Sequence, residues 1–203
     1  RAERGKYNGK DYSMVVLRKV ILYPLEAGAK TIEPFKIDLD AEVPTGRRDW
    51  FGEYEMRVIE KSLSTGTQTI NVKPLPDNGK PASFTGAVGN FDFKVIPSKT
   101  ALKAGESLDL EVSVSGKGNL KLFTLPKPVV PTALEMYEPS HTENVQTPLT
   151  GMVGKVSDKY TIIPQFKGKY TIKPMEFSYY DLASKLYKTI TSKEITIDVA
   201  EGD

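Results

Sequence analysis

Few residues in this chain have the types and spacing that catalysis or metal binding requires. It contains no cysteine and one histidine, His141, which lies in the polar segment PSHTEN. Without cysteine there is no disulfide, no thiolate metal ligand and no cysteine nucleophile. A single imidazole leaves carboxylates as the remaining metal ligands, and these favour Ca²⁺ or Mg²⁺. We therefore expect His141 to be an exposed loop residue, and we assign no catalytic residue, no metal ligand and no cofactor.

Three acidic residues, Asp38, Asp40 and Glu42, stand two positions apart. On a strand this spacing places their carboxylates on one face, and one interpretation is a Ca²⁺ site. An internal repeat of the chain puts serine, tyrosine and leucine at the matching positions, which argues against that interpretation. We expect a solvated strand face.

The segment RRDWFG contains four candidate contact residues, Arg47, Arg48, Trp50 and Phe51, and Trp50 is the only tryptophan of the chain. Arginine and aromatic residues are enriched where one protein binds another. Two interpretations remain open. The segment contacts a partner, or it folds back and packs Trp50 over the end of its own domain.

The glycine-rich run FTGAVGNF, residues 84–91, has the composition of a phosphate-binding loop but not its context. No Gly-Lys-Ser/Thr sequence follows it, and the next segment has the pattern of a strand where a phosphate loop needs a helix. We expect a glycine-mediated entry into a strand, with Phe84 and Phe91 as core anchors.

The elements around these residues are predicted to be strands. The segment LDLEVSV, residues 108–114, alternates apolar and polar residues with period two, as a strand with one buried face does. The segment SGKGN, residues 115–119, is expected to be a glycine-rich turn. About eight or nine such strands within about 115 residues, without a convincing helix, predict an immunoglobulin-like β-sandwich.

The chain also repeats itself. Residues 23–34 reappear as residues 163–174 at an offset of 140, which aligns Pro24 with Pro164 and Gly28 with Gly168. A second echo, TINV at 69–72 and TIDV at 196–199, has an offset of 127, so the first copy contains 13 additional residues. We expect Pro164 at a strand end and Gly168 with positive φ in a hairpin turn, because proline cannot donate to a ladder and glycine tolerates that φ.

The repeat predicts an all-β protein of tandem immunoglobulin-like β-sandwich domains. Residues 1–75 are expected to be the C-terminal part of a first domain that is truncated on its N-terminal side. Residues 76–83 form a Pro-rich linker, and residues 84–203 form a complete second domain. A half-sandwich has an open sheet edge, so we expect residues 1–75 to pack against the second domain or to pair with another chain, for example as an edge-strand dimer.

Charge and hydropathy exclude two classes of partner for this stretch of sequence. There are 28 Lys+Arg and 26 Asp+Glu residues, spread along the chain, so no basic patch indicates nucleic-acid binding. No apolar stretch approaches about 18 residues, the length that a membrane-spanning helix requires. The chain starts with arginine and has no signal-peptide pattern. We expect it to be a piece of a longer protein.

Residues 84–91, together with the segment at 116–119, resemble the signature of BatD, the Bacteroides aerotolerance (oxygen tolerance) family. The residues that carry the resemblance are Phe84, Gly86, Gly89, Asn90, Phe91, Gly116, Gly118, Asn119, Pro164 and Gly168. The resemblance implies a protein with tandem immunoglobulin-like domains on the periplasmic, extracytoplasmic face of a membrane, anchored by a segment outside this chain. It also implies that von Willebrand A-domain proteins and a MoxR-type ATPase are partners, and it brings no catalytic residue.

Two functions are compatible with these residues. The first is a non-enzymatic interaction scaffold of a membrane-anchored aerotolerance or envelope-stress complex. The alternative is a carbohydrate-binding or adhesive module that uses exposed aromatic rings at Trp50, Phe51, Tyr179 and Tyr180. An enzyme would need a deep pocket that gathers His141 with two or more carboxylates.

Overall fold

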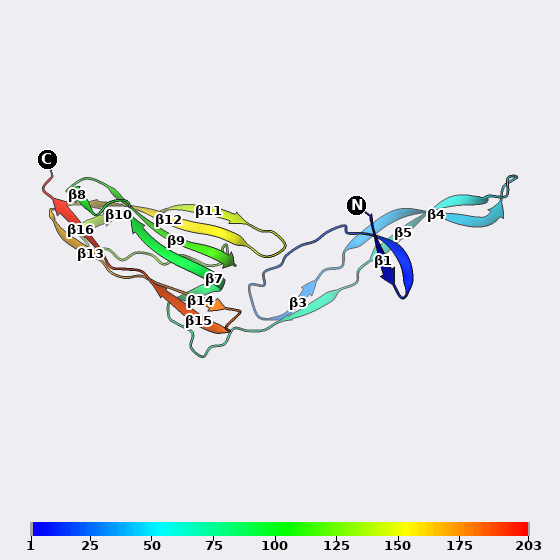
Figure 1. Ribbon diagram of the computed structural model, residues 1–203, viewed down its shortest axis with the longest axis horizontal. Helices are drawn as coiled ribbons and strands as arrows, with labels where there is room; N and C mark the ends of the chain where they lie inside the picture. The colour runs from blue at the N-terminus through cyan, green and yellow to red at the C-terminus, as the bar shows by residue number, and fades with distance from the viewer. Residues whose placement is uncertain (1, 203) are drawn as a thin grey trace. The chain divides into compact units, whose positions relative to one another are not determined.

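The computed structural model describes residues 2–202, which contain sixteen strands and no helix (Figure 1). The predicted all-β class is confirmed. The first six strands are β1 Ala2–Tyr7, β2 Lys10–Val15, β3 Gly28–Ile32, β4 Lys36–Arg48, β5 Tyr54–Ser64 and β6 Gln68–Val72. The next ten are β7 Phe84–Pro97, β8 Ala101–Lys103, β9 Leu108–Gly118, β10 Leu134–Met136, β11 Ser140–Gln146, β12 Val153–Pro164, β13 Gly168–Ile172, β14 Glu176–Asp181, β15 Leu186–Thr191 and β16 Ile195–Ala200. Within residues 2–202, no helix has the length and apolar character to cross a membrane.

The chain divides into two compact units, which are Arg1–Tyr23 with Pro76–Asp203, and Pro24–Leu75. The second unit ends at the residue where the predicted first domain ends. Residues 1–23, which the repeat assigned to that domain, group with the other unit.

In the larger unit, β1 and β2 form an antiparallel two-stranded sheet of their own, and the strands from β7 to β16 form a sandwich of two sheets. One sheet has seven strands in the order β10-β12-β9-β7-β14-β15, with β11 also paired to β12, and the other has the order β13-β16-β8. Figure 1 shows β7, β9 and β12 side by side. Alternate residues of β9, from Leu108 to Val114, are buried in one core with Ile172 and Ile197 of the smaller sheet. Strand alternation therefore directs one face of each sheet into a shared core.

An aromatic cluster occupies one part of this core. The ring of Phe177 lies 6.1, 5.6 and 5.4 Å from the rings of Phe91, Phe93 and Phe123. Phe91 is buried, which confirms it as a core anchor. Phe84 is instead half-buried outside the core cluster and packs edge-to-face on Tyr187, 5.0 Å between ring centroids.

The segment at 115–119 is not the predicted turn, because β9 continues through it to Gly118. Gly118 pairs with Gly89 of β7, and Gly116 pairs both with Phe91 of β7 and with Gly154 of β12. A Cβ added at Gly116 or Gly118 would lie 2.2 or 2.3 Å from a carbonyl oxygen of β7. Glycine is required at these positions because the neighbouring backbones approach closely. A glycine-rich segment is typical of a turn as well, so the sequence alone does not distinguish the two.

The link from Pro164 to Gly168 also differs in part from its prediction. Pro164 ends β12, and Gly168 begins β13 with φ 157°, as expected. However, β13 pairs with β16 in the smaller sheet, whereas β12 pairs with β9 in the larger one. The link therefore crosses from one sheet to the other and is not a hairpin.

The internal repeat is present in the strand pairing. In the smaller unit Gly28 pairs with Val72, and in the larger unit Gly168 pairs with Val199, which preserves both sequence offsets. The same offsets relate the hairpin β4–β5 to the hairpin β14–β15, which begin at the pairs Lys36–Ser64 and Glu176–Thr191. Two pieces of chain with the same register at both pairings are copies of one four-strand unit.

The two hairpins differ in where they turn. Asp181 ends β14, and its carboxylate accepts hydrogen bonds from Ala183 N, Ser184 Oγ and Lys188 Nζ. The Lys188 bond, with the bonds from Ala183 and Ser184, lowers the pKa of Asp181 to about 2, so this carboxylate stays ionised and closes the turn. The matching residue of β4 is Ala41, which pairs with Ile59 while the ladder continues towards Arg48. The 13 additional residues of the first copy therefore lengthen this hairpin.

The acidic row lies on β4 as predicted. Asp38, Asp40 and Glu42 are exposed, while the residues between them are half-buried. Asp38 accepts a hydrogen bond from Ser62 Oγ on β5. Within residues 2–202, no group of three or more histidine or acidic residues has a geometry that could hold a metal ion.

Candidate interaction site

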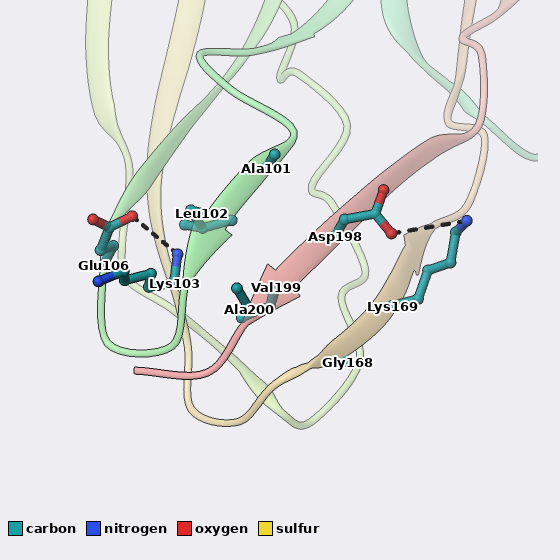
Figure 2. Close-up of a pocket in the computed structure, with 9 residues that line it drawn as sticks. All are labelled: Ala101, Leu102, Lys103, Glu106, Gly168, Lys169, Asp198, Val199 and Ala200. Carbon is teal, nitrogen blue, oxygen red and sulfur yellow. Dashed lines mark hydrogen bonds and ion pairs between the residues drawn. The ribbon is translucent and has the colours of Figure 1, made fainter. Parts of the chain in front are cut away.

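A surface hollow of about 640 Å³ lies at the end of the smaller sheet of the larger unit (Figure 2). Its two carboxylates are both engaged. Asp198 lies 3.8 Å from Lys169 Nζ, and Glu106 accepts a 3.0 Å hydrogen bond from the backbone N–H of Lys103. That bond and the charge of Lys99 lower the pKa of Glu106, whereas a general acid needs a raised one. Glu106 therefore does not have the property that a general acid needs.

His141 is not among the residues that line this hollow. It belongs to the strand β11 and not to the predicted loop, because residues 140–146 pair along β12. Its side chain is exposed, as predicted. His141 Nδ1 lies 2.6 Å from Asp158 Oδ1, and His141 Nε2 lies 3.6 Å from Glu143 Oε1. These two carboxylates, Asp158 first, raise the pKa of His141 against a smaller opposing effect of burial.

The raised pKa gives a testable prediction on the single histidine of the chain. Because the folded state binds this proton more tightly than the unfolded state, its stabilising effect is present below the unfolded pKa and is lost as pH rises through the folded pKa. The imidazole resonance in an NMR titration should therefore have its midpoint above about 6.5. Asp158→Asn should lower that midpoint towards the ordinary value, whereas Asp92→Asn, which removes an exposed carboxylate on β7 that pairs with Lys94, should not. An unchanged midpoint in Asp158→Asn would contradict the assignment.

The β4–β5 hairpin carries the candidate contact residues at its tip. Trp50 is 96% exposed and Phe51 is 87% exposed. The interpretation that Trp50 packs over the end of its own domain is therefore wrong. Tyr179 and Tyr180 are buried in β14, so they cannot join these rings in an exposed carbohydrate-binding platform.

The tip is held by a set of hydrogen bonds around Asp49 and Arg48. Asp49 Oδ1 accepts from the backbone N–H groups of Phe51 and Glu53, both at 2.9 Å. The Arg48 guanidinium donates to Gly52 O at 2.9 Å and to Tyr54 Oη at 3.1 Å, and it stacks 4.5 Å from the centroid of the Tyr54 ring. The turn is closed by Gly52 N–H donating to Asp49 O at 3.0 Å. The two exposed rings therefore project from an ordered turn.

Arg47 completes the tip, because its side chain is also exposed. The sequence pointed to Arg47, Arg48, Trp50 and Phe51 but not to Asp49 and Tyr54, which order the turn. A signal for Asp49 was present, because aspartate at the first position and glycine at the fourth are typical of a type I turn. We define the tip surface as Arg47, Trp50 and Phe51.

Comparison with known protein families decides the family. A family model described as the BatD DUF11 like domain matches residues 95–199, more than half of the chain. The chain belongs to the BatD family. This confirms the resemblance found in the sequence and fits a protein associated with Bat aerotolerance. No curated protein matches the chain.

The BatD match begins after the signature run at 84–91, but the structure joins that run to the matched residues through Asn119. The register between β7 and β14 shifts after the pair Phe84–Ser178, which indicates a bulge in β7. Asn119 Nδ2 donates to Gly86 O at 2.8 Å, and Asn119 Oδ1 accepts from Val88 N–H at 2.7 Å. The side chain thus supplies hydrogen-bond partners on both sides of Ala87. These signature residues stabilise the fold and do not form part of the tip surface.

Proposed function

We propose that this BatD chain is a non-enzymatic interaction module on the extracytoplasmic face of a membrane-anchored protein. In this proposal the tip surface binds a protein partner, and the partner class is the von Willebrand A-domain protein that works with a MoxR-type ATPase in aerotolerance or envelope stress. The observation that carries the proposal is the exposure of Trp50 and Phe51 on an ordered hairpin tip.

Two physical arguments support a binding role for this tip. Tryptophan, tyrosine and arginine are enriched among the residues whose truncation costs about 2 kcal/mol or more at protein interfaces, and phenylalanine is enriched in the interfaces themselves. A tip that is already ordered by Arg48 and Asp49 loses little further conformational entropy on binding. The β4–β5 hairpin is also longer than the β14–β15 hairpin, so its additional residues are not required to form the four-strand unit that both copies share.

The test is recovery of partners from membrane extracts by the intact protein and by its Trp50→Ala variant. We expect wild-type protein to recover a von Willebrand A-domain protein, and the variant to bind it about 30-fold more weakly, which corresponds to about 2 kcal/mol. Phe166→Ala is the matched control, because Phe166 is also an exposed aromatic residue but lies outside the tip. It should bind as wild type does.

The outcome also separates the scaffold function from the carbohydrate-binding alternative. Undiminished recovery by Trp50→Ala, with its fold retained by circular dichroism, would overturn the assignment of the tip surface. Recovery of no protein, together with retention on glycan beads that Trp50→Ala loses, would favour the carbohydrate-binding alternative.

A further inference from the structure

The smaller unit, Pro24–Leu75, exposes residues whose counterparts form the core of the larger unit. Strands β3, β4, β5 and β6 correspond in register to β13, β14, β15 and β16. Ile32 is 37% exposed and Ile70 is 49% exposed, whereas their counterparts Ile172 and Ile197 are 1% and 0% exposed. The same side chains at the same register positions therefore face a packed core in one copy and solvent in the other.

Within residues 2–202, the second copy has neighbouring paired strands that the first copy lacks. β14 pairs in parallel with β7, and β16 pairs in parallel with β8. Across the residues that the structure describes, β4 pairs with β5 alone and β6 with β3 alone. One edge of β4 and one edge of β6 thus have unpaired N–H and C=O groups, at the positions where the second copy has a parallel partner.

The sequence just before the smaller unit indicates what covers it. At the same offset of 140, Val16, Val20 and Leu22 match three buried residues of β12, and the matching residues are Val156, Tyr160 and Ile162. The chain therefore enters β3 with the apolar pattern with which β12 enters β13. In the larger unit, β7 and β9 precede β12 in chain order and complete its sheet.

We infer that Pro24–Leu75 is the second half of a β-sandwich of the same fold, and that its β4 edge accepts a strand like β7 in parallel. The strand comes from the same polypeptide, ahead of Val16 in chain order, as part of a sheet that covers Ile32 and Ile70. The expected partner is an extended segment with the alternating apolar residues of β7, and pairing places it at the register of Phe84 to Val88 on β14. This inference does not depend on the function proposed for the tip surface.

A substitution in the intact protein tests whether the face of the smaller unit that contains Ile32 and Ile70 is covered by other strands. Ile70→Ser should lower the thermal unfolding midpoint by about 10 °C, since a buried polar substitution in a domain of this size has an effect of that order. Val58→Ser is the matched control, because Val58 is exposed in the part of the hairpin that has no counterpart. It should shift the midpoint by less than about 2 °C. Equal small shifts for both variants would overturn the inference.

Hydrogen exchange tests the edge and the source of the strand without any substitution. Amides of residues 37–41 should exchange about 100-fold more slowly in the intact protein, purified alone, than in the 203-residue chain. Equal rates would overturn the inference. Protection that disappears on dilution would place the strand in a second molecule and would overturn its assignment to the same polypeptide.

Discussion

Gly118→Ala is expected to lower the free energy of unfolding of the larger unit by about 3 kcal/mol. Gly118 lies in β9 with φ 155°, where a residue with a side chain is strained. An added Cβ would lie 2.3 Å from Val88 O and 2.5 Å from Phe91 Cζ, so both β7 and the core ring would have to move. Urea denaturation of the 203-residue chain, followed by circular dichroism, measures the effect.

Gly105→Ala separates the two causes of the loss at position 118, which are backbone strain from the positive φ and close contact of the added Cβ with β7. Gly105 also has a positive φ, 84°, but an added Cβ there meets no atom within 4 Å. Its substitution should therefore cost only the backbone strain, about 1 kcal/mol. If the two variants were equally destabilised, close packing between β7 and β9 would not be the reason for glycine at position 118.

Phe177→Ala is expected to cost about 3–5 kcal/mol, because truncating a buried phenylalanine removes its transfer free energy and leaves a cavity. Phe177 is among the largest fully buried side chains of the described residues. Its ring contacts the rings of Phe91, Phe93, Phe123 and Tyr179, with centroids 5.4–6.1 Å away. The same urea experiment should show a lower midpoint with little change in slope.

Phe166→Ala provides the comparison for this substitution. Phe166 is 70% exposed, in the link that crosses between the sheets. Its removal should change the free energy of unfolding by less than about 0.5 kcal/mol. A loss at Phe177 no larger than the loss at Phe166 would mean that the aromatic cluster does not form the core.

Because the two copies share one strand register, most residues of the first copy have counterparts in the second with which they can be compared. Residues of Pro24–Leu75 can be compared one by one with residues of a completed sandwich, as Ile70 is with Ile197 and Ala41 with Asp181. Where the two differ, the difference has a physical reason. Asp181 closes a short turn, and alanine at the matching position lets the hairpin extend to the ordered tip that exposes Trp50.

The all-β class, the duplication and the exposed acidic face of β4 could all be predicted from the order of the amino acids. These properties depend on the period of two along each strand and on the spacing of proline and glycine, which are local and can be counted. The offsets of 140 and 127 found in the sequence recur in the strand pairing, because copies of one fold share their register.

Other features became clear only in the folded chain, because they depend on residues far apart in the sequence. Gly116 and Gly118 belong to a strand because neighbouring strands pair with them, and local composition cannot distinguish that from a turn. His141 is in a strand because β12 supplies its hydrogen bonds, although its own segment is polar. Trp50 is exposed because the hairpin tip is closed by Asp49 and Arg48 and not by packing of the ring. In each case the deciding contact comes from backbone or side-chain geometry that sequence periodicity does not record.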